Sequence, residues 1–238
     1  AQAGERCTVL TTQFSRQWAV AAADASPGVE DRGTYLAILE RIVGQGLPEH
    51  EDRFHQILHE RSSVLFGKLP PRALTRFNLY SAFVVDKKTG KNNLSRLDAV
   101  FAAAKRHNQM ILPVLTGSSG ACENEKFKER SWYQSGWHTT EIAAGMTFSD
   151  WLSTAIKRWR DEPTLAGWEP VGESEASNCG ATGCAWQTRT CPANGAAVLR
   201  TFFDEVGQRI RAIDPTHPIF SGFVGGDQCG LTGGDYAR

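Results

Sequence analysis

Apolar and polar residues follow two alternating patterns from about residue 73 onward. Short apolar runs rich in β-branched and aromatic residues predict strands, and apolar residues spaced three or four apart predict amphipathic helices. The predicted strands are residues 73–85, 110–116, 164–171 and 218–224, and the predicted helices between them are residues 93–107, 147–160 and 192–213. This alternation predicts an α/β fold with a parallel sheet.

The predicted connections differ in length at the two ends of the strands. Helix-to-strand loops have two to four residues, whereas the strand-to-helix loops over residues 117–146 and 172–191 have about 30 and 20. Long loops at the carboxyl ends of parallel strands form the functional face of α/β proteins. We therefore expect the site just after the strands.

The N-terminal part has a weaker pattern. Residues 7–11 are a possible strand, and two amphipathic helical stretches follow. His55 and His59 lie four apart on the second stretch, but no third ligand is evident and the order is not that of a zinc protease, so we predict no metal site. We divide the chain at Pro70-Pro71 into an N-terminal segment, residues 1–72, and a barrel portion, residues 73–238.

Composition narrows the classes of partner. Lys plus Arg and Asp plus Glu both number 26, and the pI is about 7.2. The formal net charge is therefore zero, which argues against a nucleic acid or an anionic membrane as partner. No apolar run reaches the roughly 18 residues that span a bilayer. We expect a monomer that binds neither nucleic acid nor membrane.

The cysteines indicate an oxidising compartment. The chain has six cysteines, an even number, at positions 7, 122, 179, 184, 191 and 229. Five of the six lie in loop-like stretches. This pattern favours disulfides and secretion over a reduced cytosolic enzyme, and the small residues Ala1-Gln2-Ala3 fit a mature end left by signal cleavage. We expect at least two disulfides, with Cys179 or Cys191 joined to Cys229 as the leading pairing.

Three carboxylates lie within seven residues at the end of one buried strand, in the segment WEPVGESE. Strand alternation places Glu169 and Glu173 on one face, with Glu173 at the mouth of the sheet. A carboxyl at an apolar rim keeps its proton, as a general acid requires, so we expect Glu173 to be partly buried with a raised pKa. The alternative is that these acids are solvated charges or ion-pair partners of Arg158 and Arg160.

Tryptophans in the long loops are candidate sugar platforms. Trp132 and Trp137 lie in the loop after the second predicted strand, and Trp186 lies in the loop after Glu173. Flat apolar rings with a polar edge suit the faces of sugar rings. Glu175 and Asp227, which follow the third and fourth strands, are candidate polar contacts. The alternative is that each Trp anchors its loop on the barrel rim.

Several segments together resemble glycoside hydrolases of clan A. LAGWEPVGESEA resembles their fourth strand, RLDAVFAAAKRHNQMILPVLTG their second helix and third strand, and GGDQCG the end of the fifth strand in the secreted actinobacterial branch related to family 5, the cellulase and mannanase family. The resemblance covers about residues 70–238. It implies a (β/α)8 TIM barrel that hydrolyses a β-1,4-linked glucan or mannan with retention and without a cofactor.

The resemblance also implies roles for single residues. Glu173 matches the acid/base, and Arg76 matches the second-strand arginine near the nucleophile. Gly172 stands where the family has an Asn that contacts the 2-hydroxyl of the substrate, and the loss of that contact weakens the expectation of normal turnover.

The family nucleophile lies at the end of the seventh strand, beyond Arg238. With about five strands the barrel is apparently incomplete, and we expect slower hydrolysis than in a complete relative. Glu123, Glu175 and Asp227 do not lie opposite Glu173 in the family's arrangement. The alternative function is therefore a non-catalytic carbohydrate- or partner-binding protein on a truncated or decayed barrel.

Overall fold

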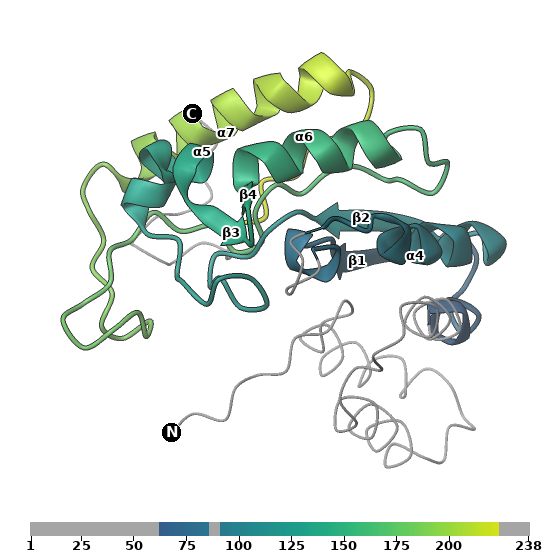
Figure 1. The fold of residues 1–238 in the computed structure, drawn as a ribbon, viewed down its shortest axis with the longest axis horizontal. Helices are drawn as coiled ribbons and strands as arrows, with labels where there is room; N and C mark the ends of the chain where they lie inside the picture. The colour runs from purple at the N-terminus through teal and green to yellow at the C-terminus, as the bar shows by residue number, and fades with distance from the viewer. Residues whose placement is uncertain (1–61, 86–90, 224–238) are drawn as a thin grey trace, which may run out of the picture.

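A parallel sheet forms the centre of the computed structural model, which describes residues 62–85 and 91–223 (Figure 1). Strand β1 (Leu74–Asn78) pairs with β2 (Met110–Val114) in parallel register. Two extended segments continue the sheet: a third segment, residues 164–174, bridges to β2, and a fourth segment, residues 218–223, bridges to the third. The order of the strands in space thus follows their order in the chain, as in a βα barrel.

Each predicted helix lies between two consecutive strands, as the alternation indicated. They are α4 (Ser95–Arg106), α6 (Phe148–Trp159) and α7 (Gly195–Ile213). The smaller elements are η1 (Ser81–Phe83), η2 (Trp132–Gly136), α5 (Trp137–Thr139), β3 (Glu141–Ala143) and β4 (Met146–Thr147). The predicted strand 73–85 is too long, because the chain turns into η1 after Tyr80.

Helix α6 shows how the apolar stripe becomes the core. The hydroxyl of Thr147 caps the helix by accepting a hydrogen bond from the Asp150 N–H at 3.2 Å, as predicted. The helix buries all its large apolar side chains, and the Trp151 Nε1–H donates to the carbonyls of Leu79 and Leu115 at 2.9 and 3.1 Å. These bonds fix the helix over the carboxyl ends of β1 and β2.

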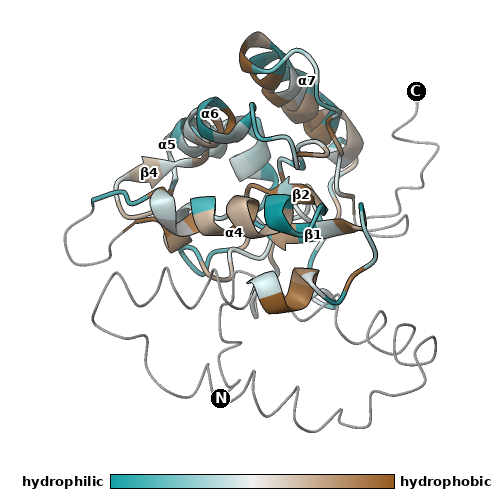
Figure 2. Cartoon of the chain, turned by 90° about the vertical axis from the view of Figure 1, so that its right-hand side faces the viewer, coloured by the Kyte–Doolittle hydropathy of each residue, from teal (hydrophilic) through white to brown (hydrophobic). Residues whose placement is uncertain are grey.

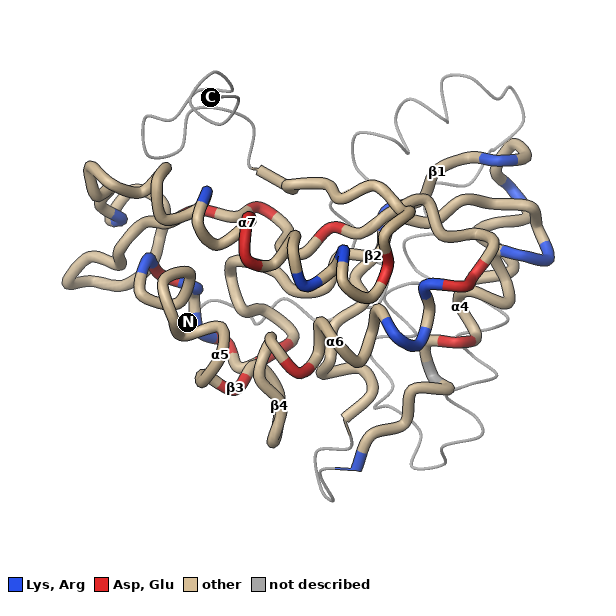
Figure 3. The backbone as a smooth tube through the Cα atoms, turned by 90° about the horizontal axis from the view of Figure 1, so that it is seen from above, with Lys and Arg blue, Asp and Glu red and all other residues tan. Residues whose placement is uncertain are grey.

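The helices are amphipathic and carry charges of both signs. Figure 2 shows hydrophobic and hydrophilic residues on each of α4, α6 and α7, and Figure 3 shows acidic and basic residues interspersed along them. Helices α6 and α7 lie side by side over the sheet (Figure 1). Among the described residues, no helix is long and apolar enough to cross a membrane.

Much of the N-terminal segment lies outside the described residues. The possible strand at residues 7–11, the two amphipathic stretches up to residue 61, and the His55 and His59 pair therefore stay predictions. The same holds for Asp227 and Cys229.

Candidate active site

A partly buried ion pair joins β1 to the third segment across the face of the sheet. Arg76 on β1 donates from Nε to Oε2 of Glu169 at 2.7 Å and from Nη2 to Oε1 at 2.5 Å. The Glu169 side chain is 4% exposed and that of Arg76 is 28% exposed. The hydrogen bonds to Glu169 raise the pKa of Arg76. A bidentate bond of this kind fixes the guanidinium plane and leaves three of its five N–H groups for other acceptors.

Glycines on two neighbouring segments make room for this pair. A Cβ atom on Gly172 would lie 2.8 Å from Nη2 of Arg76, and one on Gly222 would lie 2.4 Å from Oε1 of Glu169. Both distances are too short for a side chain. Gly172, which departs from the family's Asn, therefore leaves space that the Arg76 guanidinium occupies.

Tyr80 extends the site and was missed by the sequence reasoning. Its hydroxyl lies over Gly117, where a Cβ atom would be 2.7 Å away, and its ring stacks on Phe83. Burial, and then the nearby carboxylate of Glu123, raise its pKa, so the phenol keeps its proton. Tyr80 follows Arg76 by four residues, and the period-two alternation of a strand could have indicated the shared face.

Glu173 lies at the carboxyl end of the third segment in a left-handed backbone conformation. Its φ angle is 56°, and its N–H donates to the carbonyl of Gly222 at 2.8 Å. It directly follows Gly172, which adjoins the Arg76 guanidinium and bridges to Gly117, over which the Tyr80 hydroxyl lies. Glu173 therefore lies next to the part of the site that Arg76 and Tyr80 form. The expectation of partial burial is wrong, because the side chain is exposed to solvent. Left-handed conformations in residues other than glycine are uncommon and cluster at functional sites.

Two other candidate carboxylates are engaged elsewhere. Glu175 is buried and pairs with Arg189 at 2.9 Å, so it is an ion-pair partner rather than an open substrate contact. The side chain of Glu123 is fully buried and pairs with Lys128 at 2.8 Å, and the hydroxyl of Thr116 also donates to it. Burial raises the pKa of Glu123 against the opposing effect of Lys128. Neither group faces Glu173 as a free second carboxylate.

Two of the three candidate tryptophans are buried, and the third is exposed. Trp132 and Trp137 are 6% and 0% exposed and pack against Phe148 and Phe202, so the prediction that they are platforms is wrong. The alternative, that they anchor their loop, is correct. Trp186 is 69% exposed.

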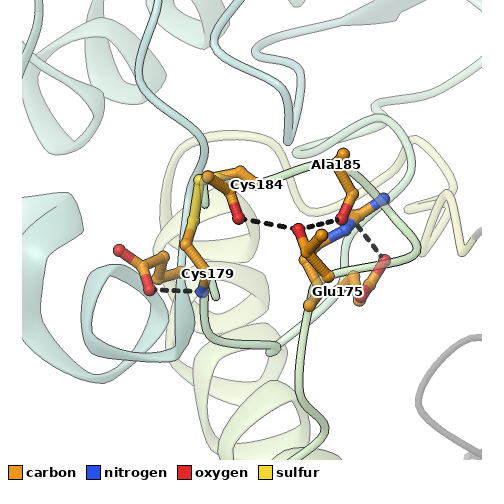
Figure 4. The surroundings of a disulfide bond; sticks show 8 residues. Glu175, Cys179, Cys184 and Ala185 are labelled. Carbon is orange, nitrogen blue, oxygen red and sulfur yellow. Dashed lines mark hydrogen bonds and ion pairs between the residues drawn. A yellow bond between two sulfur atoms is a disulfide. The ribbon is translucent and has the colours of Figure 1, made fainter. Parts of the chain in front are cut away.

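The cysteines form disulfides, and one of the two predicted partners of Cys229 is excluded. Cys179 bonds to Cys184 within one loop (Figure 4), so the pairing of Cys191 with Cys229 stays a prediction, because Cys229 lies outside the described residues. Cys122 and Cys191 are disulfide-bonded as well. The expectation of at least two disulfides is therefore confirmed.

Comparison with known proteins finds sequence similarity to mannan endo-1,4-β-mannosidases. No family model matches the chain. It is 26% identical over 146 residues to a probable mannan endo-1,4-β-mannosidase F of Aspergillus flavus, which covers 60% of this chain and 27% of the relative. It is 23% identical over 139 residues to the mannan endo-1,4-β-mannosidase F of Aspergillus clavatus, covering 58% of this chain and 28% of the relative. The chain thus spans about a quarter of the length of these relatives.

A solved structure supports the fold. The endo-β-1,4-mannanase from Thermotoga petrophila superposes with a TM-score of 0.50 at 16% identity, over 74% of this chain and 40% of that one. The described segments therefore form part of a TIM-barrel fold. The sequence similarity supports the resemblance to mannanases, while the narrower actinobacterial assignment stays a prediction.

Proposed function

We propose that the chain is part of a glycoside hydrolase that acts on β-1,4-mannan, with Glu173 as its general acid/base. The observation that carries the proposal is the position of Glu173, which has a left-handed conformation at a strand end, directly after the glycine that adjoins Arg76 and the Tyr80 site. The names of the sequence relatives favour mannan over glucan.

In a retaining reaction Glu173 gives its proton to the glycosidic oxygen and later takes one from water. Its exposure lets it exchange protons with solvent between the steps. Arg76, held by Glu169, supplies a fixed positive charge and free donors beside it, and the protonated Tyr80 supplies a further hydroxyl donor. Because Glu123 and Glu175 each form an ion pair with a basic side chain, we place the nucleophile outside the described residues.

The alternative is a protein that binds the polysaccharide without cleaving it. One observation favours it: Gly172 has no side chain with which to contact the 2-hydroxyl, and the Arg76 guanidinium occupies the adjoining space. A binding protein needs the Arg76 and Tyr80 donors but not the proton of Glu173.

Mass spectrometry can distinguish the two functions even if turnover is slow. The 238-residue chain is incubated with β-1,4-mannohexaose in H2(18)O, and labelled shorter products are counted. We expect labelled products whose rate falls at least about 100-fold in Glu173→Gln, the usual scale of general acid/base catalysis. The control is Glu205→Gln, which changes a half-exposed carboxylate on α7. Equal rates in Glu173→Gln and the unmodified chain contradict the proposal, and binding without products supports the alternative.

We also propose that the protein acts outside the cell. The support is the set of disulfide-bonded cysteines, because such bonds persist in oxidising compartments. Thiol titration of the denatured, non-reduced protein is expected to detect fewer than three thiols. A result of six thiols contradicts both the bonds and the location.

A further inference from the structure

The chain from Asn178 to Thr190 forms a closed loop that extends from the strand ends (Figure 1). Asn178 and Thr190 exchange two backbone hydrogen bonds of 2.9 Å, and the disulfide between Cys179 and Cys184 closes the loop further along. The Thr188 hydroxyl then donates to backbone carbonyls of the loop at 2.8 and 2.9 Å. The loop is therefore shaped by its own bonds.

The base of the loop is attached to the body of the protein. Arg189 pairs with Glu175 at 2.9 Å and lies over the ring of Phe127 at 4.6 Å. The N–H of Cys179 donates to the carboxylate of Glu129 at 2.7 Å. These contacts set the direction in which the loop leaves the sheet.

Trp186 lies on this loop and is the most exposed large apolar side chain among the described residues. Residues 181–187 are all exposed, and residues 176–188 include no charged side chain. A neutral surface of one indole with hydroxyl and amide groups does not suit a nucleic acid or a charged peptide. It suits a neutral polysaccharide, whose sugar faces stack on aromatic rings and whose hydroxyls bond to polar edges.

We propose that Trp186 is a sugar-binding platform distinct from the Arg76 and Glu173 site, and that it contacts a more distant part of the same neutral polysaccharide chain. This inference rests on the proposed function, because the loop follows the strand that ends in Glu173. A rigid aromatic side chain on a loop that is already shaped loses little conformational freedom when it binds. A chain must reach both the platform and the Arg76 and Glu173 site to gain from both, so the platform favours long chains over short ones.

Affinity electrophoresis in gels that contain soluble β-mannan tests the proposal. We expect Trp186→Ala to weaken binding of mannan roughly tenfold, equivalent to about 1.4 kcal/mol, and Trp186→Phe to retain most of it. Binding of mannobiose by either variant is expected to match that of the unmodified chain. Val64→Ala, which removes another exposed apolar side chain, serves as the matched control.

Other outcomes overturn the proposal in distinguishable ways. Unchanged mannan binding in Trp186→Ala removes the platform, and an equal loss for mannobiose and mannan places Trp186 in the reaction site instead. A dimer that dissociates in Trp186→Ala makes the loop a contact between copies. If the unmodified chain binds mannan without hydrolysing it, and Trp186→Ala weakens this binding, the platform is supported and the enzymatic function is contradicted.

Discussion

Two long loops at the same edge of the sheet differ in the burial of their tryptophans. The loop after β2 buries Trp132 and Trp137 in the aromatic cluster beneath α6 and α7, where the Arg209 guanidinium lies over the Trp137 ring at 4.8 Å. The loop after the third segment exposes Trp186. A position in a loop above the sheet therefore does not decide whether an aromatic ring is available to a ligand.

The two loops are also anchored by different chemistry. The first is anchored by the buried ion pair of Glu123 and Lys128, whose ammonium group also donates to the Gly117 carbonyl at 2.6 Å. The second is closed by a disulfide and hydrogen bonds of its own backbone. The first loop is thus part of the core, and the second is a shaped extension of it.

The largest expected difference is in the stability effects of the tryptophans. Trp137→Ala is expected to lower the free energy of unfolding by about 3–5 kcal/mol, because it leaves a cavity in the aromatic cluster. Trp186→Ala is expected to change it by less than about 0.5 kcal/mol, since the side chain is exposed. Urea denaturation of both variants measures the contrast. Similar losses in the two variants contradict the comparison.

Removal of one partner of the buried ion pair is expected to destabilise the first loop. Lys128→Met leaves Glu123 uncompensated, and we expect a loss of about 3 kcal/mol at pH 7. The pKa of Glu123, already raised by burial, then rises further above its unfolded value of about 4.3. The stability of the protonated form is fully present below about pH 4 and is lost as the pH rises through the folded pKa. The deficit is therefore expected to narrow in acid.

The control for this experiment is the double variant Glu123→Gln with Lys128→Met. It removes both charges, so its deficit relative to the unmodified chain is expected to vary less between pH 4 and pH 7. A Lys128→Met deficit that is equally large at both pH values shows that the buried carboxylate is not its cause.

Removal of the disulfide is expected to affect the second loop more than the fold. Cys179→Ser with Cys184→Ser opens a short loop, which costs at most about 2 kcal/mol in the chain-entropy model. Amide hydrogen exchange is expected to accelerate at residues 179–190 and to stay unchanged in α6. Acceleration throughout α6 indicates instead that the loop supports the core.

The smallest expected effect is a gain in stability. Glu173→Gly relieves the left-handed conformation of a residue other than glycine, and we expect a gain of about 1 kcal/mol. The variant also removes the proposed acid/base. A loss of stability shows that the Glu173 side chain makes contacts that outweigh the strain of its backbone.

Periodicity predicts the three long helices and β2 because each of them buries one stripe or face, but it overextends β1 and misses the short elements between β2 and α6. It does not predict that Trp132 is buried, since its partner Phe202 lies 70 residues later in the chain, on α7. The bond from Arg76 to Glu169 joins residues 93 apart, and no spacing rule reveals it. The bond from the Glu173 N–H to Gly222 likewise joins two distant segments, although the resemblance to glycoside hydrolases identified Glu173 itself as the candidate acid/base.

A crystal structure of Glu173→Gln with β-1,4-mannotetraose tests the central claim most directly. The substitution keeps the shape of the side chain and removes the transferable proton. We expect the amide of residue 173 to lie about 3 Å from a glycosidic oxygen, within hydrogen-bond distance, with Arg76 and Tyr80 beside the same sugar. An oligosaccharide bound away from the carboxyl ends of β1 and the third segment contradicts the account.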